Sequence, residues 1–318
     1  MKVTNHQPSD EKVQRTQASC NELAKQIARV VRDDGVVEAL PGVYLSRRAA
    51  PTELGRGIWP ASFCVIAQGS KEVLLGEAHY HYDPAHYLIA TATLPVASRI
   101  VEATPEQPYL GFVLTLDPVL VSSVITEADS PALQSQSSVK AINVSPLDAE
   151  LLDAAVRLVR LIDTPKEARF LTPLITREII YRLLMGEQSS RLRYFTGVGG
   201  NSQRIAEAIA RLHQEFDQPL RMEEMASKLG MSVSSFHHHF KEVTSMSPLQ
   251  FQKHLRLQEA RRLMLGERLD ANSAGSRVGY DDTSHFNREY KSLFGAPPRR
   301  DVERLRATTW QTGDGGVN

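Results

Sequence analysis

The sequence predicts an α+β fold, in which a β-rich N-terminal part is followed by helices and the C-terminal part is all helical. Short apolar runs separated by glycine, proline and aspartate fill residues 42–117, as in a sandwich or small barrel of short strands. From residue 145 the apolar residues follow the spacing of amphipathic helices. A motif at residues 221–248 recurs at residues 271–298, and each copy indicates two short helices around a glycine turn.

Length and composition limit the number of domains and the class of protein. The 318 residues are enough for two domains, and 42% of them are hydrophobic, as is usual for globular chains. The first residues lack the apolar run of a signal peptide, and no segment approaches about 18 uninterrupted apolar residues. Cys20 and Cys64 are too few for a disulfide framework and are not spaced for zinc. We therefore expect a cytoplasmic protein with no membrane contact.

The net charge is zero, which by itself argues against a nucleic acid partner. The two parts of the chain differ, however. From Arg191 onward there are 19 Lys and Arg against 15 Asp and Glu, whereas the preceding residues contain 18 basic and 22 acidic side chains. The basic excess therefore accompanies the repeated motif, and ordinary scatter of charge is the alternative interpretation of so small a difference.

The N-terminal part is expected to form a β-rich region at about 36–117, whose interior could hold a small ligand. Residues 22–31 have the pattern of an amphipathic helix, and the polar residues 1–18 before them are expected to be frayed. Two further helices at about 145–187 predict a hairpin with an apolar stripe. The stripe packs either on the chain's own strands or on a partner chain.

The first copy of the repeat predicts a supporting helix, a turn at Gly230 where positive φ is expected, and a second helix capped by Ser232. Phe236 and Phe240 are placed on the inner side of that second helix. Its outer side then presents candidates for contact with base edges in the major groove. These candidates are Ser234, His237 and His238.

The second copy aligns with the first at an offset of 49 residues before the turn and 50 after it. With Asp282 as the cap and Phe286 and Tyr290 inside, its outer side carries Thr283, Ser284, Asn287 and Arg288. Arg288 is the strongest single candidate for a base contact, because a guanidinium can pair bidentately with guanine. The candidates for phosphate contact are Lys241, Lys291, Arg299 and Arg300. For any one of these residues, a solvated helix face is the alternative interpretation.

The residues from Gln203 to Arg306 resemble the paired helix-turn-helix domain of AraC/XylS transcription regulators, on the runs ASKLGMSVSSFHHHFK, LRLQEARRLM and VGYDDTSHFNREYKSLFGAPP. The preceding runs CVIAQGSKEV, HYHYDPAHYLIA and PYLGFVLTLDP are similar to the cupin-like N-terminal domain of one AraC subgroup. Two positions depart from the family pattern: Ser245 replaces a glycine and Gly275 replaces an alanine. The resemblance assigns the base-facing positions to Ser234, His237, His238, Thr283, Ser284 and Arg288.

The resemblance implies a sequence-specific DNA-binding regulator whose small-molecule effector acts at a cupin-like barrel with a helical hairpin. It implies a sensor and dimerisation domain at 1–195, a linker at 196–202, a DNA-binding domain at 203–308 and a flexible tail at 309–318. The two helix-turn-helix motifs then lie at about 221–241 and 271–294. A homodimer is a further expectation, and an activator would also contact RNA polymerase.

A cupin-like metal-dependent enzyme with an accessory helical domain is the alternative function. No carboxylate pair or nucleophile with a base can be placed, so we expect no catalytic residue and no cofactor. His237, His238 and His239 are consecutive on a helix and should point apart, and His79, His81 and His86 lack the expected carboxylate, so no metal site is expected.

Cys64 has two interpretations. A buried thiol is usually an inert packing residue. Alternatively, Cys64 senses a reactive electrophile such as an aldehyde, because regulators with this type of N-terminal domain include aldehyde-responsive members.

Overall fold

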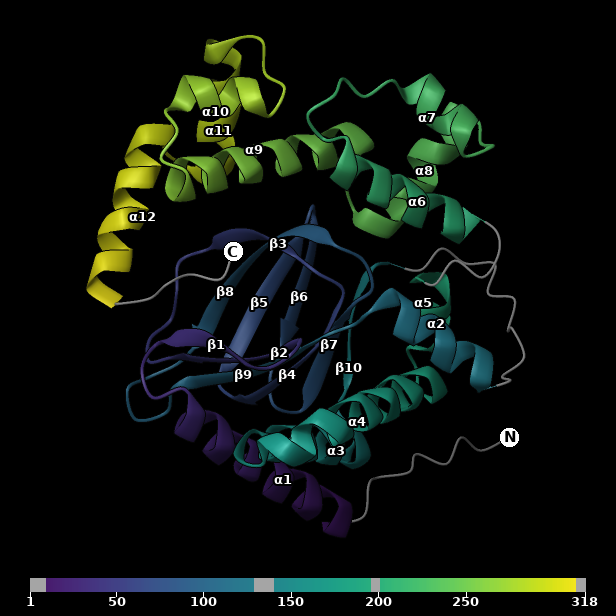
Figure 1. The fold of residues 1–318 in the computed structure, drawn as a ribbon, viewed down its shortest axis with the longest axis vertical. Coiled ribbons are helices and arrows are strands. Elements are labelled where there is room, and N and C mark those ends of the chain that lie inside the picture. The colour runs from purple at the N-terminus through teal and green to yellow at the C-terminus, as the bar shows by residue number, and fades with distance from the viewer. Residues whose placement is uncertain (1–9, 129–139, 196–200, 313–318) are drawn as a thin grey trace.

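The structure, a computed structural model, describes residues 10–128, 140–195 and 201–312 (Figure 1). Two antiparallel sheets and the helices beside them form the N-terminal part, and the described residues from 149 onward form helices and no strands. The α+β class predicted from the sequence is therefore confirmed. Within the described ranges, no helix is both long enough and apolar enough to cross a membrane.

The larger sheet has six strands in the order β1-β2-β9-β4-β7-β10, and the smaller has four in the order β3-β8-β5-β6. Every pairing between neighbouring strands is antiparallel. The strands are β1 (Gly35–Leu40), β2 (Val43–Arg48), β3 (Gly55–Trp59), β4 (Ser62–Gln68), β5 (Ser70–Leu75), β6 (Ala78–Tyr82), β7 (His86–Ala90), β8 (Leu94–Glu102), β9 (Tyr109–Thr115) and β10 (Ile142–Pro146).

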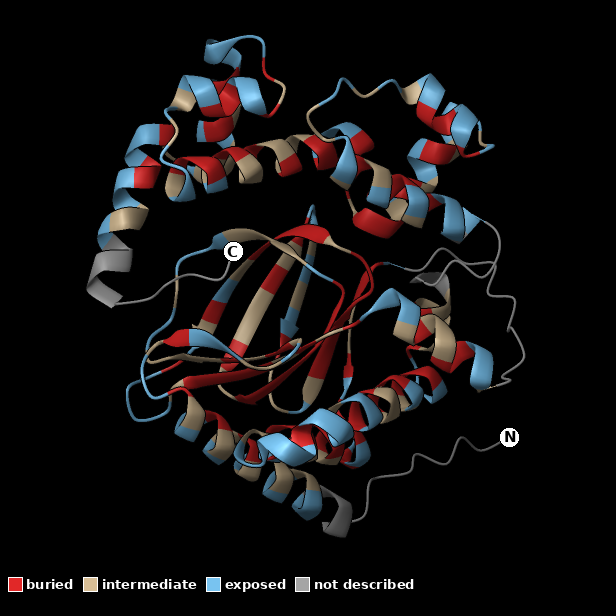
Figure 2. Ribbon diagram, viewed as in Figure 1, coloured by how far each residue is buried: buried red, intermediate tan, exposed pale blue. Residues whose placement is uncertain are grey.

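The central strand β4 shows how the two sides of the larger sheet are used. Phe63 and Val65 belong to the core that the helices cover, whereas Cys64 and Ile66 belong to the core that also contains residues of the smaller sheet. Successive side chains of a strand point to opposite sides of the sheet, as they do here. Both sides of β4 are buried (Figure 2), which explains its nearly continuous apolar run.

Helices α1 (Asp10–Val30), α3 (Ala149–Arg160) and α4 (Pro165–Met185) lie on the side of the sheets opposite the C-terminal helices (Figure 1). Helix α2 (Pro118–Glu127) lies beside α4. Residues 10–18, expected to be frayed, instead form the beginning of α1, because its apolar side packs on the sheet. Ile179 and Leu183 of α4 are buried on the chain's own core, whereas Leu174 of the same helix is 60% exposed.

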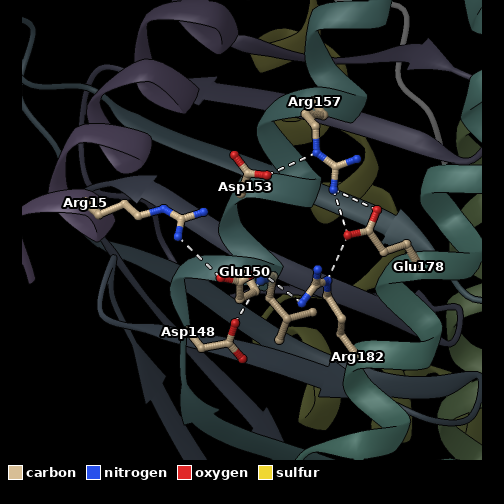
Figure 3. A network of polar contacts seen from close by, with 8 residues as sticks. Arg15, Asp148, Glu150, Asp153, Arg157, Glu178 and Arg182 are labelled. Carbon is tan, nitrogen blue, oxygen red and sulfur yellow. Dashed lines mark hydrogen bonds and ion pairs between the residues drawn. The ribbon is translucent and has the colours of Figure 1, made fainter. Parts of the chain in front are cut away.

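Ion pairs connect α1, α3 and α4 along their polar sides (Figure 3). Arg157 of α3 donates to both carboxylate oxygens of Glu178 on α4 at 2.7 Å. Arg182 of α4 lies 2.9 Å from Glu178 and 3.3 Å from Glu150, which in turn is 3.4 Å from Arg15 of α1. These alternating charges link the three helices, and such partly exposed pairs each contribute about 0–1 kcal/mol.

The C-terminal helices are α5 (Ser189–Phe195), α6 (Asn201–Gln214), α7 (Met222–Lys228), α8 (Val233–Thr244), α9 (Pro248–Gly266), α10 (Ala271–Arg277), α11 (Thr283–Phe294) and α12 (Pro298–Thr312). We call α7–α8 the first helix-turn-helix and α10–α11 the second. Figure 1 shows the two motifs at opposite ends of α9. Helix α12 runs into the stretch expected to be a tail, and most of the expected linker lies outside the described residues.

The turn of the second helix-turn-helix packs closely against the segment that follows α6. Gly279 has φ +87°, and a Cβ atom built there would lie 2.0 Å from the carbonyl oxygen of Asp217. Arg256 of α9 holds both sides of this contact, because it donates to the carbonyls of Phe216, Asp217 and Gln218 and to that of Gly279 at 2.6–3.1 Å. Both the backbone conformation and the close approach therefore require glycine at this position.

We expect Gly279→Ala to lower the free energy of unfolding by more than about 2 kcal/mol, because the methyl group meets backbone and φ is positive. Urea titration followed by circular dichroism measures this. The matched control is Gly266→Ala, where nothing lies within 4 Å of the added Cβ. The control should be neutral or slightly stabilising, and equal effects of the two substitutions would contradict the contact.

Candidate nucleic-acid interface

The first helix-turn-helix is built as the sequence predicts. Gly230 has φ +62° in the turn, and the Ser232 hydroxyl accepts a hydrogen bond from the backbone N–H of Ser235 at 3.2 Å. Phe236 and Phe240 are fully buried, with ring centroids 5.6 Å apart. Because these aromatic rings anchor one side of α8, its opposite side is fixed toward the exterior.

That outer side carries the candidates from the first copy of the repeat. Ser234, His237, His238 and Lys241 are all exposed. His238 is not free, however, since its Nε2 lies 3.3 Å from a carboxylate oxygen of Glu242. A base contact by His238 would therefore require this side chain to leave the carboxylate.

The second helix-turn-helix presents a corresponding surface. Asp282 accepts from the backbone N–H of Ser284 at 2.8 Å, and Phe286 and Tyr290 are fully buried. The outward candidates differ in exposure: Thr283, Ser284 and Arg288 are exposed, whereas Asn287 is half-buried.

The basic side chains near the two motifs differ in whether they already pair with a carboxylate of the chain. Within the described ranges, none of Arg288, Lys241, Lys291 and Arg300 has a carboxylate within ion-pair distance. Arg299, by contrast, lies 2.9 Å from Glu303. The first four charges are available to an incoming anion without breaking an internal pair, whereas Arg299 must exchange one partner for another.

The two positions that depart from the family pattern have clear local explanations. Ser245 ends α8 with φ 55°, so a serine occupies the left-handed conformation that glycine adopts more easily. Gly275 is buried in α10, and a Cβ there would lie 3.0 Å from Cγ of Phe286. The missing side chain at 275 thus allows α10 to approach the ring that anchors α11.

A buried charge that the sequence did not reveal fixes the second motif. Asp301 of α12 is fully buried, and its carboxylate accepts from Tyr290 at 2.9 Å, Arg261 at 3.0 Å and Arg304 at 2.8 Å. These partners come from α11, α9 and α12. A buried carboxylate with several charge-assisted hydrogen bonds holds its neighbours in one geometry, so Asp301 orients α11 relative to α9.

The N-terminal part borders the outer side of the first helix-turn-helix. The backbone N–H of Ala141 donates to the carbonyl of Val243 at 2.9 Å, and a Cβ on Gly76 would lie 2.2 Å from the carbonyl oxygen of Ser245. A cavity of about 910 Å³ lies next to these contacts. Its lining comes from Glu77, Ala78 and Lys140 on one side and from α8 on the other, including Ser234, His237, His238 and Lys241.

Two of the three consecutive histidines of α8 lie close to one carboxylate. Ligand atoms of His238, His239 and Glu242 come within 4.8 Å of one another, so two consecutive histidines do reach one point. They do so because the Glu242 carboxylate pairs with both, at 3.3 and 3.0 Å. His79 and His81 lie on the exposed side of β6, and these two side chains point away from the space between the sheets.

Cys64 lies between the two sheets and is 2% exposed. Its Sγ is 3.6 Å from the hydroxyl of Ser62, and burial raises the pKa of the thiol. A protonated, enclosed thiol is a weak nucleophile.

Two family profiles match the chain. The profile of the AraC-type transcriptional regulator N-terminus covers residues 39–191, and that of a helix-turn-helix domain covers residues 225–304. ArgR of Pseudomonas aeruginosa is 23% identical over 128 residues, which are 40% of this chain and 39% of ArgR. GbdR of the same species is 27% identical over 135 residues, 42% of this chain and 37% of GbdR. RhaS of Citrobacter koseri is 28% identical over 145 residues, 45% and 49% of the two chains. The matches thus span less than half of these relatives' lengths.

Solved structures of ToxT from Vibrio cholerae share the fold. ToxT bound to an unsaturated fatty acid has a TM-score of 0.52 at 10% identity, over 82% of this chain and 93% of ToxT. ToxT bound to (E)-4-(8-methylnaphthalen-1-yl)but-3-enoic acid has a TM-score of 0.54 at 9% identity, over 83% and 98% of the two chains.

Acid should weaken the contact between α9 and the smaller sheet. His254 of α9 has its pKa lowered to about 4, first by burial and then by the charges of Arg56 on β3 and Lys253. The unfolded chain takes up this proton near pH 6.5, but the folded chain takes it up only near pH 4. Protonation therefore favours the unfolded state, and stability is lost as the pH falls from 6.5 toward 4.

We expect the urea midpoint of His254→Leu to fall less between pH 7 and pH 5 than that of the wild type. The matched control is His79→Leu, which removes an exposed histidine of β6. If both variants kept the wild-type pH dependence, His254 would not be the responsible group.

Proposed function

We propose that this chain, which belongs to the AraC family, regulates transcription by binding DNA in a sequence-specific way with its two helix-turn-helix motifs. One observation carries the proposal: α8 and α11 present exposed polar and basic surfaces and are joined by the single helix α9. Two such motifs suit successive major-groove segments about 34 Å apart on one side of the duplex.

The residues divide into two roles under this proposal. Arg288 reads a base edge, with Thr283, Ser284 and Asn287 beside it, and Ser234, His237 and His238 serve the first motif. Lys241, Lys291 and Arg300 contact phosphates, which supply affinity without sequence information. Arg299 has a weaker claim to such a contact because of its pair with Glu303.

A small-molecule effector controls this activity from the N-terminal domain, which we place in the cupin-like class. Support comes from the match to the AraC-type N-terminus and from the fatty acid bound to ToxT, a protein of the same fold. Cys64 is a candidate sensor of a reactive aldehyde only if the space between the sheets opens. The protein acts in the cytoplasm as a regulator and not as an enzyme, and as an activator it would contact RNA polymerase.

The contact between the two parts of the chain suggests how an effector acts. In the described arrangement, Glu77 in the turn between β5 and β6, Ala78 at the start of β6 and Lys140 border the same side of α8 that would face the major groove. DNA and the N-terminal part therefore compete for this space. An effector that binds more tightly when the contact is broken favours DNA binding. An effector that binds more tightly when the contact is kept opposes DNA binding.

A homodimer through α4 completes the proposal. Exposed apolar side chains follow one side of this helix, namely Phe170, Leu171, Leu174, Tyr181 and Met185. Phe170 is 72% exposed and Leu174 60% exposed. An apolar stripe of this length on one helix is typical of an interface and not of a solvated surface.

We expect Arg288→Ala to weaken binding by about 1–3 kcal/mol and to relax discrimination at one base pair. Fluorescence anisotropy measures this on a duplex selected by the wild-type chain from a random-sequence library and on its single-base variants. The control, Lys291→Ala, should weaken all duplexes alike and make affinity less dependent on salt. A uniform loss for Arg288→Ala would make Arg288 a phosphate contact, and failure to select any duplex would overturn the proposed function.

We expect Leu174→Glu to shift the chain from dimer to monomer in sedimentation velocity, because it places a charge in the apolar stripe. Val119→Glu is the matched control, since Val119 is 78% exposed on α2. If the wild type sediments as a monomer, or if both variants change the mass equally, α4 is not the interface.

A further inference from the structure

Three side chains of α8 bring atoms that can bind a metal ion close together. Nε2 of His238 lies 3.3 Å from one carboxylate oxygen of Glu242, and Nδ1 of His239 lies 3.0 Å from the other oxygen. All three ligand atoms lie within 4.8 Å of one another. In the described part of the chain, no other group of three histidine, cysteine or acidic side chains is this compact.

The geometry of the helix explains this arrangement. Consecutive residues lie about 100° apart around a helix, which is why the histidine run alone predicted no metal site. Glu242 follows one turn later, about 40° from His238 and about 60° from His239, and therefore lies between them. His237 lies about 140° from Glu242, on the other side of the helix. One carboxylate thus brings two of the three histidines toward a single point.

The distances suit a zinc ion. Zn²⁺ binds imidazole nitrogen and carboxylate oxygen at about 2.0–2.2 Å in a tetrahedron, whose ligand atoms lie about 3.3 Å apart. The separations of 3.3 and 3.0 Å between the histidines and Glu242 are close to that value. Only the two ring nitrogens must come closer together, and the side chain of His238 is 67% exposed and has room to turn.

A neighbouring helix holds one of the two rings. The side-chain amide nitrogen of Asn201 on α6 lies 2.9 Å from Nε2 of His239. A histidine that binds a metal ion through one ring nitrogen usually donates a hydrogen bond from the other. With Nδ1 of His239 on the metal, Nε2 carries the hydrogen, and Asn201 accepts it through its oxygen after rotation of the amide. The contact to α6 therefore orients His239 as a ligand.

We propose that His238, His239 and Glu242 bind one Zn²⁺ ion, or a similar transition-metal ion, with water as the fourth ligand. Two imidazoles and one carboxylate suit Zn²⁺, Ni²⁺ and Cu²⁺ better than Mg²⁺ or Ca²⁺, which prefer oxygen ligands alone. The cavity of about 910 Å³ beside α8 has His238 and Glu242 in its lining, so the fourth position is open to water.

The bound ion opposes DNA binding by the first helix-turn-helix. His238 is a candidate for a base contact, and it must leave Glu242 to make that contact. A metal ion holds both side chains together and so keeps His238 away from the bases. This consequence rests on the proposed function, whereas the metal site itself does not.

Isothermal titration with zinc chloride tests the site on the purified full chain, without an affinity tag and after removal of bound metal. We expect the wild type to bind one ion tightly. His238→Ala and Glu242→Gln should each weaken binding at least about tenfold, since loss of even an outer partner of a metal ligand costs about 10–100-fold. Because both side chains are at least partly exposed, circular dichroism should show an unchanged fold.

Two variants serve as matched controls. His237→Ala removes the histidine of the same run that lies on the other side of α8. His285→Ala removes the histidine whose Nε2 lies 3.6 Å from Glu289 at the same four-residue spacing on α11. Both should keep the zinc affinity of the wild type. No zinc binding by the wild type, or one affinity for the wild type, His238→Ala and Glu242→Gln, would overturn the site.

Fluorescence anisotropy tests the consequence, on a duplex that the wild-type chain selects in the presence of a chelator. Zinc should weaken wild-type binding at least about fivefold, as a typical coupling between two ligands does, and leave the affinity of Glu242→Gln unchanged. An equal loss in both proteins, or none in either, refutes the opposition between metal and DNA. A chain that selects a duplex but binds no zinc refutes the site and leaves the proposed function intact, and the reverse result does the opposite.

Discussion

The guanidinium group of Arg256 determines how the two DNA-binding motifs are positioned relative to each other. Arg256 of α9 donates four hydrogen bonds, three to carbonyls of residues 216–218 and one to the carbonyl of Gly279. The first three belong to the segment that leads into the first motif, and the last belongs to the turn of the second. Charge-assisted bonds to several carbonyls are stronger than neutral ones. We call α6–α12 the reader; Arg256 connects the approach to its first motif with the turn of its second, and Asp301 connects α9, α11 and α12.

The helices of the reader follow from the sequence because their determinants are local. Caps at Ser232 and Asp282, glycines in the turns and aromatic residues at helical spacing all fix structure within a few residues. The contacts of Arg256 and Asp301 were not predictable in this way. Each joins residues about 10–40 positions apart, and a charged side chain on a helix has the same sequence pattern whether it faces water or a carbonyl.

The N-terminal part shows the same division between local and distant determinants. Helical spacing predicted an apolar stripe at about 145–187, but the spacing alone did not distinguish Ile179 of α4, which is buried, from Leu174, which is exposed. For Cys64 the sequence left two interpretations, an inert packing residue and a sensor of a reactive electrophile. Only the arrangement in space shows that Cys64 lies enclosed between the two sheets. The enclosure of Cys64 depends on strands that are distant in the sequence, so residue type alone could not decide between the two interpretations.

The single helix between the two motifs limits the spacing of the half-sites that the protein can bind. Helix α9 has 19 residues and therefore a length of about 28 Å, and it contains no hinge within that length. One base pair inserted between two half-sites moves the second by about 3.4 Å and turns it by about 34° around the duplex. Because α9 is one continuous helix, the two motifs cannot follow that rotation. All binding sites should therefore have the same number of base pairs between their half-sites, and a sequence search with that fixed spacing should recover them.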